Sequence, residues 1–160
     1  MTKTWLLALS SAAALAVSPG APAQQPATGW YIGGDVGQAS FAGEDDTAFK
    51  LLGGYQINRH FAAEGAYSWL SDKNGAEITA FELVAVGSFP LASQLSVLGR
   101  LGFTNAYIES PTVDQEKVEL TYGIGLQYDM TPKLGIRGQW QRYDTDEEID
   151  LFSIGVLWRF

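Results

Sequence analysis

The chain of 160 residues contains no cysteine and a single histidine, His60. Without cysteine, an exported protein of this size has no disulfide bonds, so its stability must come from other interactions. Lysine and arginine are also few, 10 against 18 acidic residues. This balance argues against nucleic acid as a partner, because phosphates attract clustered basic side chains. After residue 23 no apolar run approaches the ~20 residues that a membrane-spanning helix needs.

The first 23 residues have the three parts of a secretory signal peptide. Lys3 gives a short positive start, residues 5–17 are apolar and uncharged, and residues 21–23 (Ala-Pro-Ala) provide the small residues that signal peptidase needs. We therefore expect cleavage before Gln24, which leaves residues 24–160 as one domain. Since Lys3 is the one ionisable residue lost, that domain has 9 basic and 18 acidic residues and a net charge near −9.

Residues 48–70 consist of two runs of alternating apolar residues joined by a short turn at residues 58–60. Period-two alternation predicts strands, and two such runs around a polar turn predict a hairpin. The same alternation recurs in six further segments, at residues 30–41, 77–89, 95–107, 118–130, 134–143 and 149–160. We therefore predict an all-β chain of eight strands.

The predicted connections alternate in length. Those at residues 58–60, 90–94 and 131–133 are short turns, whereas four longer, mostly polar or acidic loops are predicted at residues 43–46, 71–75, 109–117 and 144–148. An even number of strands, with short turns at one end and longer loops at the other, is typical of antiparallel up-and-down outer-membrane barrels. In such a barrel both termini lie on the periplasmic side.

Each predicted strand has one aliphatic and aromatic face and one face of small and polar residues. Glycine is frequent on the second face, at Gly33, Gly37, Gly54, Gly102, Gly123, Gly125 and Gly155. An eight-stranded barrel has an interior barely wide enough for side chains, so small residues must make room for a few long ones. A soluble lipocalin-like barrel is the alternative, but it would have an apolar interior. The pattern favours a transmembrane β-barrel with aromatic girdles.

Several motifs resemble the OmpA transmembrane-domain family in order and spacing. Residues 53–58 (GGYQIN), followed by Glu64 and residues 67–70 (YSWL), are similar to its second and third strands. Further matches are Phe89-Pro90, Arg100-Leu101-Gly102, Tyr128 with Thr131-Pro132, and the terminal Trp158-Arg159-Phe160, so the resemblance spans essentially residues 29–160. It implies an outer-membrane protein of a Gram-negative bacterium with a structural role in the envelope. A small low-conductance porin-like channel and a surface adhesion or recognition protein are the alternatives.

The resemblance also implies partners. Trp158 and Phe160, with alternating apolar residues before them, resemble the signal that the outer-membrane assembly machinery reads. Outer-membrane lipid and lipopolysaccharide are the other expected contacts, and we expect a monomer. Because the chain ends at Phe160, the peptidoglycan-binding domain of full-length OmpA is not expected.

Strand parity places five candidate site residues inside the barrel. The resemblance implies that Glu64 and Arg137 meet there as a carboxylate and a guanidinium. Counting back from the turn at residues 131–133 puts Gln127 directly opposite Arg137. Glu82 and Arg100 are inward near-diagonal neighbours across the turn that follows Phe89.

These residues have a structural and a functional interpretation. As a polar plug, they pair buried charges, and removing one partner costs roughly 3–5 kcal/mol. As a gate, they exchange partners and open a narrow path for ions. In the family a lysine–glutamate pair supplies the second partner, and the matching positions here are Val86 and Gln127. We therefore expect that second pair to be missing, which favours the plug.

The sequence predicts neither catalysis nor a cofactor. Enzymes on eight-stranded outer-membrane barrels, such as lipid A deacylases and acyltransferases, use histidine at the outer leaflet, whereas His60 falls in a predicted periplasmic turn. No base is thus expected beside a serine nucleophile. The acidic segments at residues 44–46 and 144–150 could hold divalent cations near lipopolysaccharide phosphates. Because neither has EF-hand spacing, we interpret them as solvated charges and predict no metal site.

Overall fold

The computed structural model describes residues 28–41, 44–71, 77–109, 115–144 and 149–160. The predicted signal peptide, residues 1–23, lies outside these ranges. The described residues form eight strands: β1 (Gly29–Phe41), β2 (Glu44–Gln56), β3 (Phe61–Ser71), β4 (Glu77–Pro90), β5 (Leu95–Glu109), β6 (Gln115–Asp129), β7 (Leu134–Asp144) and β8 (Ile149–Arg159). Within the described ranges no helix is long and apolar enough to cross a membrane.

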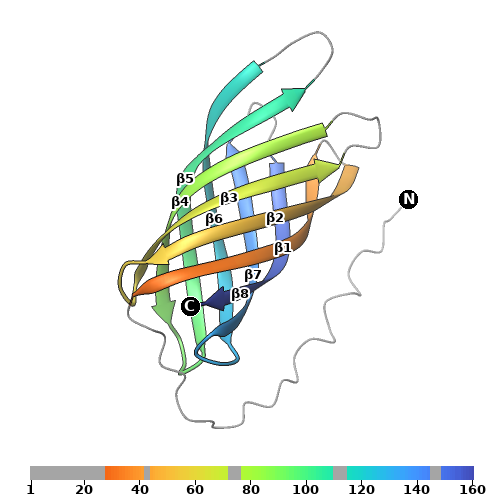
Figure 1. Cartoon of the computed structure of the whole chain (residues 1–160). Coiled ribbons are helices and arrows are strands. Elements are labelled where there is room, and N and C mark those ends of the chain that lie inside the picture. Colours follow the sequence, from red (N-terminus) through yellow and green to blue (C-terminus); the bar gives the residue numbers. More distant parts are fainter. Residues whose placement is uncertain (1–27, 42–43, 72–76, 110–114, 145–148) are drawn as a thin grey trace, which may run out of the picture.

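The eight strands close into a barrel in sequence order. Each strand pairs antiparallel with the next, and β8 pairs antiparallel with β1, from Tyr31 opposite Arg159 to Ser40 opposite Asp150. The turns after β2, β4 and β6 and the end of β8 lie together at one end of the barrel, the turn end (Figure 1). We call the opposite end the loop end. The predicted eight-stranded up-and-down barrel is confirmed.

Side chains of the turns satisfy backbone groups that the sheet leaves free. The Asn58 carboxamide oxygen accepts hydrogen bonds from the backbone N–H groups of His60 at 2.8 Å and Phe61 at 3.0 Å. The Thr131 hydroxyl accepts from the N–H groups of Lys133 at 3.2 Å and Leu134 at 2.9 Å. Asn and Thr stabilise tight turns in this way, which explains why short polar segments reverse the chain here.

All four predicted longer loops are shorter in the structure than in the sequence prediction, and Ser71 ends β3. Residues 44–46 belong to β2, where they pair with residues 39–41 of β1. Glu109 ends β5, residues 115–117 begin β6, and Asp144 ends β7. Polar composition suggested loops, but the antiparallel ladder continues beyond the apolar part of each strand. The remaining predicted loop residues, 43, 72–75, 110–114 and 145–148, lie outside the described residues.

The outer face of the barrel is apolar and the inner face is polar. Large side chains exposed on the outside include Trp30, Ile32, Leu51, Tyr67, Phe81, Leu83, Phe103, Ile124, Phe152, Ile154 and Trp158. Buried side chains on the inside include Asp35, Lys50, Glu64, Glu82, Arg100, Arg137 and Gln141. A soluble barrel shows the reverse arrangement, so these exposures agree with the predicted transmembrane barrel.

The inward glycines lie where no larger residue fits. At the seven glycines predicted to face inward, an added Cβ would come closer than 3.0 Å to another atom. At the outward Gly53, Gly99 and Gly138, by contrast, an added Cβ would meet nothing within 4 Å. Gly54 lies under the Tyr31 ring and Gly155 under the Asp35 carboxylate. Glycine thus makes room for the long side chains that fill the interior.

Candidate functional site

The polar interior contains equal numbers of acidic and basic groups. Among the described residues, eight ionisable side chains that carry charge at neutral pH are buried: Asp35, Glu64, Glu82 and Asp129 against Lys50, Arg100, Arg137 and Arg159. Buried charges require partners because water no longer solvates them. The contacts of these groups therefore decide whether the interior is closed.

Glu64 on β3 is the centre of the first cluster. Its Oε1 accepts hydrogen bonds from the Tyr31 hydroxyl at 2.7 Å and from Arg137 Nη1 at 2.6 Å. Its Oε2 lies 3.1 Å from Nη2 of Arg100. The side chain of Glu64 is 0 % exposed. Strands β1, β5 and β7 thus meet at one carboxylate, and Glu64 and Arg137 touch as the resemblance implied.

Glu82 on β4 is the centre of a second cluster, nearer the loop end. Lys50 Nζ lies 3.0 Å from both of its carboxylate oxygens. Gln141 Nε2 donates to Oε2 at 3.1 Å, and the Tyr143 hydroxyl donates a short hydrogen bond to Oε1. Each buried glutamate therefore has a tyrosine hydroxyl and a cation as partners.

The family's lysine–glutamate pair is missing from its matching positions, which are Val86 and Gln127, but Lys50 and Glu82 form such a pair from other positions. Val86, one of the two matching positions, is buried in an apolar cluster. Gln127, the other, accepts a hydrogen bond from Arg137 Nη2 at 3.2 Å and lies directly opposite Arg137 in the β6–β7 ladder. The sequence did not predict the Lys50–Glu82 pair, because β2 and β4 are not neighbouring strands. Strand register predicts contacts between neighbouring strands only.

Arg100 lies between the two clusters. Its Nη2 is 3.1 Å from Glu64 but 4.0 Å from Glu82, so Glu64 is the nearer carboxylate rather than the predicted neighbour Glu82. Its Nη1 donates to Gln139 at 2.5 Å, and Gln139 in turn donates to Asp35 at 2.8 Å. The Nε and Nη2 groups make no hydrogen bond. Arg100 is thus held less completely than Arg137.

A separate ion pair lies at the turn end. Arg159 Nη2 donates to Asp129 Oδ1 at 2.7 Å, and Gln127 Nε2 donates to the same oxygen at 3.0 Å. Gly135 lies beside the pair, where an added Cβ would be 2.9 Å from Asp129 Oδ1. The sequence prediction missed this pair as well, although Arg159 has inward parity in the last strand.

Buried apolar side chains also line the interior, in two clusters. The larger cluster comprises Tyr31, Leu52, Ala62, Ala66, Val84, Val86, Leu98 and Leu157. A smaller cluster of Ala39, Ala48, Tyr143 and Leu151 lies at the loop end, packed against Ile149. The polar network therefore shares the interior with two apolar clusters.

The other candidate residues lie away from this network. His60 is exposed in the turn after β2, and its Nδ1 is 3.1 Å from the Ser88 carbonyl oxygen. Trp158 and Phe160 are exposed on the outer face, 46 % and 70 % respectively. The backbone N–H of Phe160 donates to the Trp30 carbonyl at 3.1 Å, which joins the end of the chain to β1.

One carboxylate of the acidic segments, Asp150, has a partner within the protein. Asp150 receives two hydrogen bonds from Arg142, at 2.8 and 3.0 Å, directly across the β7–β8 ladder. The Arg142 guanidinium lies 5.4 Å from the centre of the Trp140 ring. Among the residues that the structure describes, no group of three or more histidine, cysteine, aspartate or glutamate side chains could hold a metal ion.

Comparisons with known proteins agree with this architecture. The sequence profile described as "Outer membrane protein beta-barrel domain" matches residues 6–160. Outer membrane protein A of Salmonella typhi is 25% identical over 168 residues, covering 82% of this chain and 48% of the relative. The chain therefore spans about half the length of the curated relatives that it matches.

Two solved structures have the same fold. The N-terminal β-barrel domain of Pseudomonas aeruginosa OprF superposes with a TM-score of 0.66 at 15% identity, covering 81% of this chain and 97% of that one. The outer membrane enzyme PagL superposes with a TM-score of 0.53 at 14% identity, covering 81% and 99%. With the profile match over nearly the whole sequence, the chain belongs to the outer membrane protein β-barrel family and is located in the outer membrane.

Proposed function

We propose that the protein serves the structure of the cell envelope as a closed barrel, and that its polar network is a plug. The observation that carries the proposal is the balance of four acidic and four basic buried side chains. Each of the eight makes an ion pair or a hydrogen bond to another interior group. An interior of zero net charge attracts neither cations nor anions, and its paired groups must be separated before an ion passes.

The plug is tested in planar bilayers and in cells. The purified protein should add no steady conductance to a bilayer, and cells that lack it should become more sensitive to detergent. Re-expression should restore resistance. Steady single-channel currents from the purified protein would contradict the plug, whereas unchanged detergent sensitivity would contradict the envelope role.

A small low-conductance channel is the second candidate, and the position of Arg100 favours it. This guanidinium lies within 4.0 Å of two carboxylates, Glu64 and Glu82, and two of its nitrogens make no hydrogen bond. A shift of Arg100 toward Glu82 would loosen the first cluster without leaving any charge unpaired. The Glu82→Gln variant removes one of the two positions and should make openings rarer.

The matched control for Glu82→Gln is Asp129→Asn, which alters the ion pair at the turn end and leaves both carboxylates near Arg100 intact. Channel openings that respond equally to both variants, or to neither, would argue against movement of Arg100.

We also propose a non-catalytic role and the partners that the family resemblance implied. The likeness to PagL, at 14% identity, concerns the fold alone. His60 is exposed in a turn, and a carbonyl oxygen rather than a serine hydroxyl lies beside its ring. Expression in cells should leave the acylation pattern of lipid A unchanged, and a changed pattern would overturn this part of the proposal.

The outward Trp158 and Phe160 suit recognition by the assembly machinery, and the apolar outer face suits contact with lipid and lipopolysaccharide. We propose that the protein acts as a monomer. Light scattering in detergent, corrected for bound detergent, should give the mass of one chain, and a dimer mass would contradict a monomer.

A further inference from the structure

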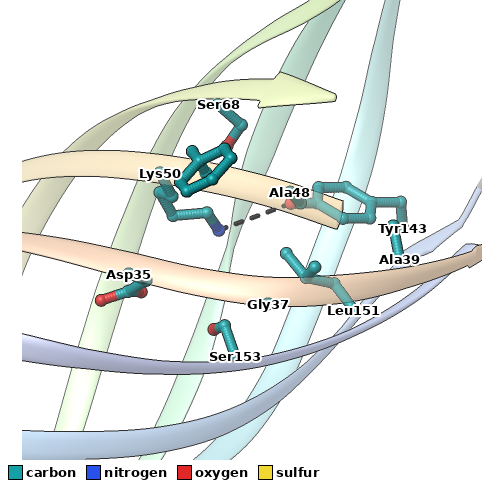
Figure 2. A pocket seen from close by; sticks show the side chains of 10 residues that line it. Asp35, Gly37, Ala39, Ala48, Lys50, Ser68, Tyr143, Leu151 and Ser153 are labelled. Atoms are coloured by element: carbon teal, nitrogen blue, oxygen red, sulfur yellow. Dashed lines mark hydrogen bonds between the residues drawn. The ribbon is translucent and has the colours of Figure 1, made fainter. Parts of the chain in front are cut away.

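A small cavity lies inside the loop-end half of the barrel, beside the Lys50 side chain (Figure 2). Strands β1, β2, β3, β7 and β8 contribute its walls. The cavity offers ≈ 10 Å³ to the centre of a water molecule. One buried water needs roughly 10–15 Å³ on the same measure, so the space suits a single small ligand.

Three polar atoms of the wall, Asp35 Oδ1, Ser68 Oγ and Ser153 Oγ, are buried without a hydrogen-bond partner. Asp35 is 5% exposed, and its Oδ2 accepts from Gln139, but its Oδ1 has no partner. Ser153 Oγ is likewise buried and without one. Asp35 lies opposite Gly155 and Gly37 opposite Ser153 in the β1–β8 ladder, so Asp35 and Ser153 are diagonal neighbours on one inner face. Buried polar groups of this kind nearly always have a partner, which points to a ligand between them.

The charges of the wall select a neutral ligand. Lys50 and Asp35 both line the cavity, and Figure 2 shows them on neighbouring strands. The ammonium group repels cations and is already surrounded by Glu82, Gln141 and Tyr143. The carboxylate repels anions. A water molecule can donate to Asp35 and exchange a second hydrogen bond with the Ser153 hydroxyl.

We propose that this cavity binds one buried water molecule, bridging Asp35 Oδ1 and Ser153 Oγ. This site extends the polar network to β8 on the loop-end side of Asp35. The inference does not depend on whether the barrel is a plug or a channel.

A crystal structure at about 2 Å resolution tests the site directly. We expect a single density peak within hydrogen-bonding distance of Asp35 Oδ1 and Ser153 Oγ, refined as water in crystals grown with sodium or with potassium. The Ser153→Ala variant should lose or weaken that peak. A wild-type map without density between the two residues would overturn the proposal, and a peak that changes with the alkali metal would identify a cation instead.

The sign of a stability change provides an independent test. If Ser153 Oγ holds a water, Ser153→Ala leaves that water and Asp35 less completely bonded, and the unfolding equilibrium constant in urea should rise about tenfold. If the hydroxyl has no partner, its removal should leave stability unchanged or raise it.

Thr104→Val is the matched control. Thr104 Oγ1 is also buried without a partner, but Thr104 does not line the cavity. We expect this variant to be no less stable than the wild type. Equal responses to Ser153→Ala and Thr104→Val would overturn the water site, even if both variants fold.

Discussion

At the scale of single residues, we expect substitution of the buried Glu64 to lower the stability of the barrel strongly. Glu64→Gln removes its charge but keeps its shape, so Arg137 and Arg100 lose their nearest carboxylate. Breaking a buried ion pair in this way costs roughly 3–5 kcal/mol. The midpoint of urea-induced unfolding of the folded barrel should therefore fall.

An exposed carboxylate is the control for this prediction. Asp150 pairs with Arg142, and the two side chains are 32% and 28% exposed. Solvent screens such a pair, so Asp150→Asn should cost at most about 1 kcal/mol. Equal losses from the two substitutions would contradict a buried, unscreened cluster at Glu64.

Individual residues also show how far the sequence can predict the site. Period-two parity assigned Glu64, Glu82, Arg100, Gln127 and Arg137 to the inner face, and the register of one tight turn placed Gln127 opposite Arg137, as the structure has it. The sequence does not predict which inward side chains contact each other, because contacts across the barrel depend on strand tilt and side-chain length. Lys50 also has inward parity, yet nothing local indicates that it reaches Glu82 rather than Asp35, its direct neighbour on β1.

At the scale of strands, a glycine on the inner face of β5, Gly102, allows β4 to lie close to it. A Cβ at Gly102 would collide with the Leu83 carbonyl oxygen and with Val84. Because these are largely backbone atoms, the collision cannot be relieved by a rotamer change. Gly102→Ala should therefore destabilise the barrel by about 1–3 kcal/mol, the usual cost of overpacking.

Gly99 provides the comparison on the same strand, on the opposite face. Nothing lies within 4 Å of a Cβ at Gly99. Gly99→Ala should thus be neutral or slightly stabilising, since alanine has less freedom to lose than glycine. Urea unfolding of the two variants side by side distinguishes an inner face that needs glycine from a strand that merely tolerates it.

The side chain of the terminal Phe160 should matter for assembly more than for stability. Phe160 is 70% exposed, and only its backbone N–H is tied to β1. Phe160→Ala keeps that hydrogen bond but alters the proposed assembly signal, so we expect less folded barrel in outer membranes while the purified, refolded variant keeps its urea midpoint. Phe152→Ala, which removes an outward ring of β8 itself, should assemble normally. Equal assembly of both variants would contradict a role for the terminal residue.

Strand ends were the least predictable feature at this scale. Residues 44–46 and 115–117 are polar or charged, and composition alone assigns such segments to loops. The ladders nevertheless extend through them, because antiparallel backbone pairing, once begun in the apolar part of a hairpin, needs no apolar side chain to continue. Apolar periodicity therefore located the middle of each strand and missed the loop ends of β2 and β6.

At the scale of the whole molecule, closure and charge are linked. Among the described residues the eight buried charged groups sum to zero, so the remaining residues of the chain carry its net charge of −8. The closed ladder leaves no strand edge free over the barrel wall, which is the condition for a sheet in lipid. The alternating strand pattern therefore places apolar residues on the outer face and paired charges inside. The excess of acidic residues lies in the rest of the chain.

A closed barrel of this kind should resist unfolding by dodecyl sulfate until it is heated. Unboiled protein should migrate faster on a denaturing gel than boiled protein, because the compact barrel keeps its backbone hydrogen bonds and binds less detergent. Since the chain has no cysteine, a reducing agent should leave both bands in place. Gly102→Ala should lower the temperature at which the fast band disappears, whereas Gly99→Ala should not. If the unboiled wild-type protein migrates with the boiled one, the strands do not form a stable closed barrel, and the buried network cannot act as a plug.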